Sequence, residues 1–285
     1  MMAVASLRGT VGEWIQGWIL PDGEALVSLT VEWRGSVRAF RGGGRSRLAP
    51  KAHRALMLAR EAFGVDDASV EVENPLRPAL GLGTSTMDVG GVIASCGALG
   101  GREVSEEELF RMCCSVEPSD GTMFRGLALV DHINGRLIER LPEPPEMWLA
   151  ALLPYRTLDT EAYRRDRGLL KAVRDRAQRH AKAYQVFKRG LLEGNSRKVA
   201  AAATMSSIIQ QAIMPREEWP LLLSACRERK GIGIAVAHSG TASGVIFKDP
   251  VSAEACREFI ASRWDLGEVR VVRACGGGVD VDVRG

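Results

Sequence analysis

The sequence predicts an α+β fold in two domains, and three observations carry this prediction. Segments typical of strands and of helices are interleaved along the chain, and hairpins are frequent among the strands. Three closely spaced prolines, Pro142, Pro144 and Pro145, form the best candidate linker. With 285 residues, 46% of them hydrophobic, the chain is long enough for two modest domains. We therefore expect an N-terminal α+β domain over residues 1–145 and a C-terminal α+β domain over residues 146–285.

Hydrophobic periodicity and turn residues predict the elements of the first half. Residues 26–33 and 36–40 have the composition of strands, and Arg34-Gly35 between them predicts a hairpin. Pro50 suits the first turn of a helix that reaches about residue 63. Ser105, with a glutamate three residues later, has the form of a capping box that opens another helix. Further elements of this half are expected at 69–73, 89–99, 127–130 and 136–139.

The second half interleaves the same two kinds of segment. We expect helices at 165–192, 196–213, 217–230 and 252–264. We expect strands at 147–153, 232–237, 243–247, 269–273 and 279–283. The pattern is typical of an α+β domain.

The composition argues against several classes of protein. A formal net charge of +3 does not indicate a nucleic-acid partner. The longest apolar stretches, near 89–99 and 147–153, are shorter than the roughly 20 residues of a membrane-spanning helix. The N-terminus lacks the basic and apolar regions of a signal peptide. The six cysteines show no paired spacing, which indicates reduced thiols and argues against a zinc site. We therefore expect a cytoplasmic protein.

One charged run stands apart from this balance. Residues 163–189 contain ten Lys or Arg and two Asp, a net charge of +8. A solvated helix face is the ordinary interpretation of such a run. An electrostatic funnel for an anionic ligand or a nucleic acid is the alternative.

The stretch from Pro78 to Asp88 reads PALGLGTSTMD and comes just before a helical segment. Glycines let backbone N–H groups approach an anion, and a helix N-terminus adds unpaired donors and a favourable dipole. Hydroxyl side chains can donate to phosphate oxygens or bind Mg²⁺. The stretch matches neither GxxxxGK[ST] nor GxGxxG, because Thr86 occupies the place of the third glycine. A tight turn with Thr or Ser as the N-cap therefore remains an alternative to a phosphate loop.

Three segments together resemble the GHMP kinases, a family that includes galactokinase, homoserine kinase and mevalonate kinase. The stretch PALGLGTSTMD resembles the phosphate loop of the family's second motif. Residues 12–18 resemble its first motif, and residues 233–247 resemble its C-terminal strand, glycine loop and strand. Within the family, the resemblance is greatest to the L-threonine kinases of cobalamin biosynthesis, and it runs over nearly the whole chain. The chain departs from those relatives at Arg77-Pro78-Ala79 and at Thr10-Val11.

The resemblance implies a two-domain GHMP kinase fold, with an N-terminal ribosomal-S5-like domain and a C-terminal ferredoxin-like domain. It implies transfer of the γ-phosphoryl group of ATP, with Mg²⁺, to the side-chain hydroxyl of L-threonine. The product would be O-phospho-L-threonine for the cobalamin nucleotide loop. Homoserine or serine as the acceptor is an alternative, and so is a non-catalytic module that binds nucleotides or nucleic acid. The partners expected are ATP and the small substrate, with no nucleic acid and no membrane. The sequence leaves the oligomeric state open, including a homodimer.

The resemblance also implies roles for individual residues. The phosphates of ATP would lie on the loop formed by Leu80, Gly81, Leu82, Gly83, Thr84, Ser85 and Thr86. The oxygens of Ser85 and Glu117 would hold Mg²⁺. Asp120 would be the base near the transferred hydroxyl, although an aspartate after Pro118 is also a common turn former.

Further candidates concern the amino-acid substrate. Binding is expected from Glu13, Asp131, His132, Ser239 and Gly240, with Glu13 suited to the ammonium group. His238 is expected to support the Gly240 loop. Arg156 and the turn at 157–160 follow a strand at the presumed domain interface, where clefts are common.

Overall fold

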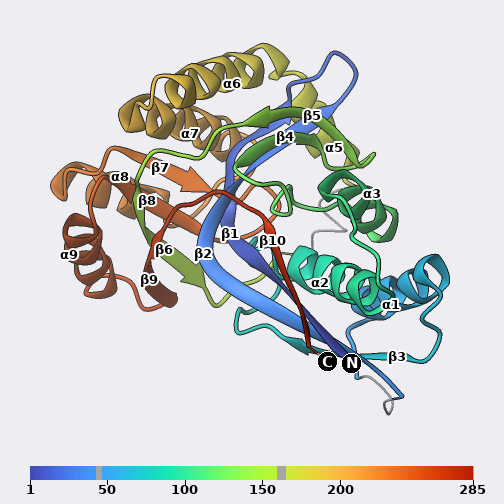
Figure 1. Ribbon diagram of the computed structural model, residues 1–285. Coiled ribbons are helices and arrows are strands. Elements are labelled where there is room, and N and C mark those ends of the chain that lie inside the picture. Colours follow the sequence, from blue (N-terminus) through green and yellow to red (C-terminus); the bar gives the residue numbers. More distant parts are fainter. Residues whose placement is uncertain (43–46, 159–164, 285) are drawn as a thin grey trace.

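The computed structural model describes residues 1–42, 47–158 and 165–284, and it contains two antiparallel sheets flanked by helices (Figure 1). The first sheet has six strands in the order β10-β1-β2-β4-β5, with β3 paired to β2. Its strands are β1 (Met2–Trp18), β2 (Glu24–Arg41), β3 (Ala68–Glu73), β4 (Leu127–Asp131), β5 (Arg136–Leu141) and β10 (Val279–Arg284). Helices α1 (Pro50–Phe63), α2 (Thr84–Leu99) and α3 (Glu106–Val116) gather beside this sheet (Figure 1).

The second sheet has four strands in the order β7-β8-β6-β9. They are β6 (Trp148–Pro154), β7 (Gly233–Val236), β8 (Ser243–Phe247) and β9 (Gly267–Arg273). The helices of this half are α5 (Arg167–Arg174), α6 (Ala177–Leu192), α7 (Ser196–Gln211), α8 (Trp219–Glu228) and α9 (Pro250–Ala261). The order of strands and helices confirms the predicted α+β class, because antiparallel strands and helices occur in both halves.

Local signals in the sequence explain several helix ends. Pro50 occupies the first turn of α1, as predicted. The Ser105 side chain accepts a hydrogen bond from the Glu108 N–H at 3.3 Å, so the predicted cap opens α3. The helix expected at 165–192 is instead divided into α5 and α6, which are separated by Asp175 and Arg176.

The hairpin expected around Arg34-Gly35 is wrong. Strand β2 runs unbroken for 18 residues, and Arg34 and Gly35 pair with Arg8 and Leu7 of β1. Strand β3 pairs with the other edge of β2 from Ser36 onward. Pairing with β1, continued by pairing of the next residues with β3, therefore keeps this glycine within a strand. The actual hairpin joins β1 to β2 across residues 19–23.

The two halves of the chain share one continuous core. Trp14 of β1 packs against Phe187 of α6 with ring centroids 5.9 Å apart. Strand β10 pairs with β1 from Met2↔Arg284 to Leu7↔Val279, so the last strand belongs to the first sheet. The termini consequently lie side by side (Figure 1). The division of the chain at residues 145/146 stays a prediction.

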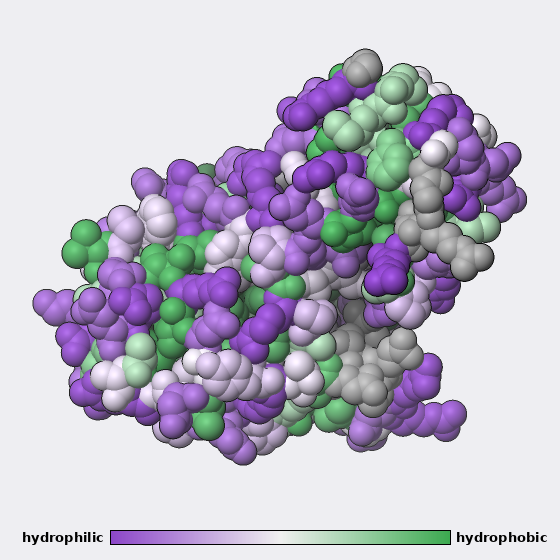
Figure 2. Space-filling view, turned by 90° about the horizontal axis from the view of Figure 1, so that it is seen from below, coloured by the Kyte–Doolittle hydropathy of each residue, from purple (hydrophilic) through white to green (hydrophobic). Residues whose placement is uncertain are grey.

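Within the described ranges, no helix has both the length and the apolar character that a membrane crossing requires. Seen from below, the surface is a mixture of hydrophilic and hydrophobic residues and is hollowed toward one side (Figure 2).

Candidate active site

The loop that precedes α2 is held between two distant parts of the chain. The Gly81 carbonyl accepts a hydrogen bond from the Gly12 N–H of β1 at 2.9 Å. The Leu80 carbonyl accepts bonds from the N–H groups of Thr241 and Ala242 at 3.0 and 2.7 Å. All three segments of the sequence resemblance therefore meet at this loop.

Two glycines of the loop have left-handed backbones, which glycine adopts without strain. Gly81 has φ +83°, and Gly83, with φ +68°, is the N-cap of α2. No side chain caps this helix, so the alternative of a turn capped by Thr or Ser is not what the structure has. The packing also demands glycine, since a Cβ on Gly240 would lie 2.5 Å from the Gly81 nitrogen. The glycine at position 240 thus permits its backbone to approach that of Gly81 closely, and any larger residue there would prevent this contact.

The N-terminus of α2 opens into a cavity of about 1060 Å³. Its walls come from the start of α1, the segment after β3, the glycine loop, and the turn after α3. The polar lining residues are Lys51, Arg54, Asn74, Thr84, Ser85, Thr86, Asp88, Glu117, Asp120 and Ser239. The volume and the mixture of apolar and polar walls are typical of a site for a nucleotide-sized ligand.

Ser85 and Glu117 meet in this cavity, as the sequence predicts. The Ser85 hydroxyl donates to Glu117 Oε1, and the Lys51 ammonium pairs with Oε2 of the same carboxylate. The Glu117 side chain is only 8% exposed. A hydroxyl and a carboxylate at the edge of a phosphate-sized space suit Mg²⁺, which takes few protein ligands and completes its shell with water and phosphate oxygens. Lys51 was missed by sequence reasoning, because nothing near Pro50 points to a carboxylate 66 residues away.

Asp120 lies beside the loop and is held by two hydroxyl groups. Its Oδ1 accepts from the Ser28 hydroxyl at 3.2 Å, and its Oδ2 accepts from the Thr86 hydroxyl at 3.3 Å. The Asp120 N–H donates to the Thr86 hydroxyl oxygen at 3.0 Å. Thr86, expected on the phosphates, thus contacts the candidate base. Ser28 was missed because a serine inside a strand carries no functional signal.

A smaller cavity of about 50 Å³ adjoins the large one. Gly81, Pro118, Asp120 and Ser239 line both of them. Glu13, Gln16, Leu26, Ser119 and His132 complete the smaller cavity. Asp120 therefore stands where the two spaces join, and Glu13 and His132 stand in the inner one.

Asp131 is not brought into either cavity. It ends β4, and its carboxylate accepts hydrogen bonds from the N–H groups of Ile133 and Asn134, from the Asn134 amide and from Arg136. Burial raises the pKa of Asp131, but the bonds from Asn134 and Arg136 outweigh it and hold this pKa below its usual value. The residue stabilises the turn between β4 and β5, which leaves no lone pair aimed at a substrate.

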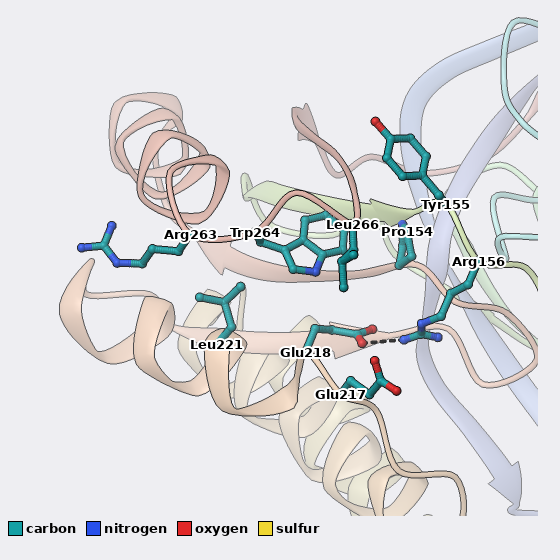
Figure 3. A pocket seen from close by; sticks show the side chains of 9 residues that line it. All are labelled: Pro154, Tyr155, Arg156, Glu217, Glu218, Leu221, Arg263, Trp264 and Leu266. Carbon is teal, nitrogen blue, oxygen red and sulfur yellow. Dashed lines mark hydrogen bonds and ion pairs between the residues drawn. The ribbon is translucent and has the colours of Figure 1, made fainter.

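Arg156 lines a different cavity, of about 350 Å³, beside α8 (Figure 3). Its guanidinium pairs with Glu218 (Figure 3). The side chains of Leu221, Trp264 and Leu266 line the same cavity (Figure 3). Leu158, from the turn expected at 157–160, does line the large cavity. Asp159 and Thr160 lie outside the described residues.

A buried arginine fixes the C-terminal glycine loop. Arg216 donates to the carbonyls of Ala237, Gly240 and Thr241, the last two at 2.9 Å. It is 5% exposed, and burial lowers its pKa. This residue was also missed, since a single arginine after a proline has no distinguishing spacing. Gly240 therefore acts on the site through its contact with Gly81.

The basic run lies on α5 and α6. Lys171 pairs with Asp175 at 2.9 Å and Arg189 with Glu193 at 2.7 Å, while Arg174 stacks over Trp18. None of its described cations lines the two joined cavities. These contacts favour the solvated helix face over the funnel. Tyr163 and Arg164 lie outside the described residues.

Known proteins of one family match this chain in sequence. Residues 50–127 match the family model of the GHMP kinases N terminal domain. An L-threonine kinase of Citrobacter freundii is 31% identical over 252 residues, which cover 86% of each chain. An L-threonine kinase of Salmonella typhimurium is 30% identical over 250 residues, covering 86% of this chain and 83% of the relative.

Solved structures share the fold at low identity. Homoserine kinase from Cytophaga hutchinsonii has a TM-score of 0.73 at 15% identity, covering 99% of this chain and 97% of that one. Mevalonate diphosphate decarboxylase from Staphylococcus aureus has a TM-score of 0.76 at 12% identity, covering 99% of both chains. By fold, by family model and by relatives that match most of its length, the chain belongs to the GHMP kinases and, among them, to the family of the L-threonine kinases.

Proposed function

We propose that the protein transfers the γ-phosphoryl group of ATP to the side-chain hydroxyl of L-threonine, giving O-phospho-L-threonine and ADP. The observation that carries the proposal is the position of Asp120, where a nucleotide-sized cavity joins a small polar one. The relatives of about 30% identity are L-threonine kinases, which supports the choice of acceptor. We further propose that the product serves the cobalamin nucleotide loop in the cytoplasm, as the sequence resemblance implies.

The phosphates of ATP would lie at the N-terminus of α2, on the loop from Leu80 to Thr86. Ser85 and Glu117 would hold Mg²⁺, which when bound neutralises charge on the β- and γ-phosphates. Lys51 pairs with Glu117 in the structure. Because Lys51 lines the same cavity, its ammonium would also be placed to donate to a phosphate oxygen of ATP.

Asp120 would orient the threonine hydroxyl and accept its proton. The hydroxyl oxygen forms a bond to the γ-phosphorus while the bond from that phosphorus to the bridging oxygen breaks. The electron pair of the broken bond stays on the β-phosphate of ADP, and the proton moves to Asp120. The hydroxyls of Ser28 and Thr86 hold the carboxylate in place during this step.

The small cavity would receive the amino-acid end of the substrate. Glu13 would supply an acidic wall for the ammonium, and His132 and Ser239 lie around the same space. Gly240 would act only through its contact with Gly81. Asp131 would contribute only by fixing the strand end that carries His132.

A substrate panel with ATP and Mg²⁺, followed by ADP release, tests the proposal. Threonine should exceed serine in kcat/KM by about five- to tenfold, because one buried methyl group contributes roughly 1 kcal/mol. Equal rates with homoserine would move the assignment to the alternative kinase. Nucleotide binding without ADP release from any hydroxyl would favour a binding module, and steeply salt-dependent affinity for oligonucleotides would favour a nucleic-acid partner. Light scattering on the same preparation tests for a homodimer.

A further inference from the structure

A buried chain of hydrogen bonds leads from the C-terminal half to Glu13. The Gln16 N–H of β1 donates to the Ser206 hydroxyl of α7 at 3.4 Å. The Ser206 hydroxyl lies 3.1 Å from His238 Nε2, and His238 Nδ1 lies 3.2 Å from Glu13 Oε2. The backbone N–H of His238 donates to the same carboxylate oxygen at 2.8 Å. Ser206 is 1% exposed, His238 2% and Glu13 5%, so these contacts are shielded from water.

The contacts of His238 hold its ring from two sides. A carboxylate oxygen accepts, so His238 Nδ1 is the donor of the contact with Glu13 Oε2. The Ser206 hydroxyl lies against the other ring nitrogen, Nε2, and also accepts the Gln16 N–H. The imidazole is therefore fixed in the orientation that directs a hydrogen bond to Glu13.

Two other ionisable groups face this chain. His180 of α6 lies close to His238, and burial, with a smaller contribution from His238, lowers the pKa of His180 to about 4, which keeps His180 neutral at pH 7. Arg216 also senses Glu13, but its guanidinium is bonded to carbonyls of the glycine loop and lies 3.6 Å from Glu218. Neither group makes a direct ion pair with Glu13 among the contacts of the described residues.

The small cavity offers a second acceptor beside Glu13. Gln16 is 5% exposed and lines this cavity, and its amide oxygen has no hydrogen-bond partner among the described residues. A buried amide oxygen without a partner is costly and is commonly satisfied by a ligand or a water molecule. A carboxylate and an amide oxygen on one small space are the acceptors that an ammonium group requires.

We infer that Ser206 and His238 are positioning residues, which hold the Glu13 carboxylate aligned so that Glu13 and Gln16 together bind the α-ammonium group of the amino-acid substrate. This inference rests on the proposed function, because it assigns the recognition of the same acceptor. On this assignment, Glu13 and Gln16 of β1 distinguish an amino acid from the corresponding hydroxy acid, and Ser206 and His238 of the C-terminal half keep Glu13 in position.

The test compares Ser206→Ala with Ser207→Ala. Ser207 is the matched control, because it is equally buried on α7 but its hydroxyl donates to the carbonyls of Ala203 and Ile234. Without the Ser206 hydroxyl, His238 Nε2 loses its contact, and the ring can turn away from the orientation that directs Nδ1 to Glu13. We expect KM for threonine to rise about tenfold in Ser206→Ala, with kcat and KM for ATP within about twofold of the wild type. Ser207→Ala should match the wild type, and Ser206→Thr, which keeps the hydroxyl, should restore most of the affinity.

The amine-free analogue 3-hydroxybutyrate separates recognition from general damage. It lacks only the α-amino group of threonine, so Ser206→Ala should leave its kinetic parameters unchanged. In a Glu13→Gln background, Ser206→Ala should have little further effect on threonine, because the group that it positions is gone. An equal rise in KM for threonine and for 3-hydroxybutyrate in Ser206→Ala, or no rise relative to Ser207→Ala, would overturn the inference. The proposed function would still stand in that case if the wild-type protein turns over threonine. A wild-type protein without turnover on any amino acid would overturn the proposed function and this inference together.

Discussion

The carboxylate of Asp120 depends on hydroxyl groups contributed by residues far away in the sequence. Ser28 comes from β2 and Thr86 from the first turn of α2, and both donate to it. A carboxylate held by two neutral donors keeps its orientation and remains able to accept a proton. The orientation of Asp120 is thus set by residues from two other elements, β2 and α2.

Replacing this carboxylate tests its role. Asp120→Asn should lower kcat by about 10²-fold or more with little change in ATP affinity, because an amide cannot take the proton. Glu117→Gln should also slow turnover but raise the Mg²⁺ concentration required, because it weakens a metal ligand. An Mg²⁺ titration of both variants distinguishes the two roles. A loss of only a few-fold in Asp120→Asn would make it a turn residue in an enzyme that works by positioning.

Ser28 offers a gentler perturbation of the same carboxylate. Ser28→Ala should lower kcat by about tenfold, because losing one hydrogen bond to a charged group costs roughly 1.5 kcal/mol or more. Thr30→Val is the control, since Thr30 is similarly buried two residues further along β2. Steady-state kinetics with saturating threonine and ATP measure the effect. Equal kcat values for the two variants would show that Asp120 is oriented without Ser28.

His180 makes the stability of the fold dependent on pH. Burial is the main cause that lowers its pKa to about 4 from an ordinary value of 6.5. Between pH 4 and pH 6.5, His180 is therefore protonated in the unfolded chain but not in the folded chain. The free energy of unfolding consequently falls as the pH drops from about 6.5 to 4, and His180 contributes about 3 kcal/mol to this fall. His180→Leu should lack this component. Urea denaturation at pH 7 and pH 4.5 measures it, and equal pH dependence in both proteins would contradict the assignment.

The sequence predicts part of this chemistry and misses the rest for a physical reason. The resemblance to the GHMP kinases predicts roles for Ser85, Glu117 and Asp120, and the structure brings them to one cavity. Ser28 and Lys51 escape notice because each acts through a partner that only folding brings near. A single sequence carries no signal for a contact of that kind.

At the level of elements, periodicity and capping residues predict most helices, whereas the extent of a strand such as β2 depends on its pairing with other strands. Pro50 and Ser105 mark helix starts through local interactions, which a sequence records directly. The prediction of a turn at Arg34-Gly35 is wrong because these residues pair with Arg8 and Leu7 of β1, which lie far away in the sequence. Helix ends can thus be predicted from residues nearby in the sequence, whereas the position of a glycine inside a strand cannot.

The contact between two glycine loops gives a prediction at this scale. Gly240→Ala should weaken ATP binding by about tenfold or more, because the new methyl group would press on the Gly81 nitrogen and the Leu80 carbonyl at 2.5 Å and displace the phosphate loop. Gly23→Ala is the control, since a Cβ there meets no atom within 4 Å. Isothermal titration with ATP measures the affinity. Unchanged affinity in Gly240→Ala would show that the loop tolerates the shift.

At the level of the whole molecule, the first sheet is completed by the last strand. β10 pairs with β1 over six residue pairs, beside the buried side chains of Ala3, Ala5 and Leu7. Ending the chain after Gly278 removes these pairs and should lower Tm by about 10 °C. Asp280→Asn is the control, because it removes only an exposed ion pair with Arg34, which contributes little. Calorimetry measures both variants, and equal Tm values would show that β10 is dispensable.

The pairing of β10 with β1 also has a consequence for how the protein is made. β1 leaves the ribosome long before β10, so the edge of β1 that β10 covers stays unpaired while the residues between them are made. The N–H groups of Thr241 and Ala242, which bind the Leu80 carbonyl, are also made long after the phosphate loop. A chain that stops before β10 therefore leaves a sheet edge open, and an open edge is prone to aggregate.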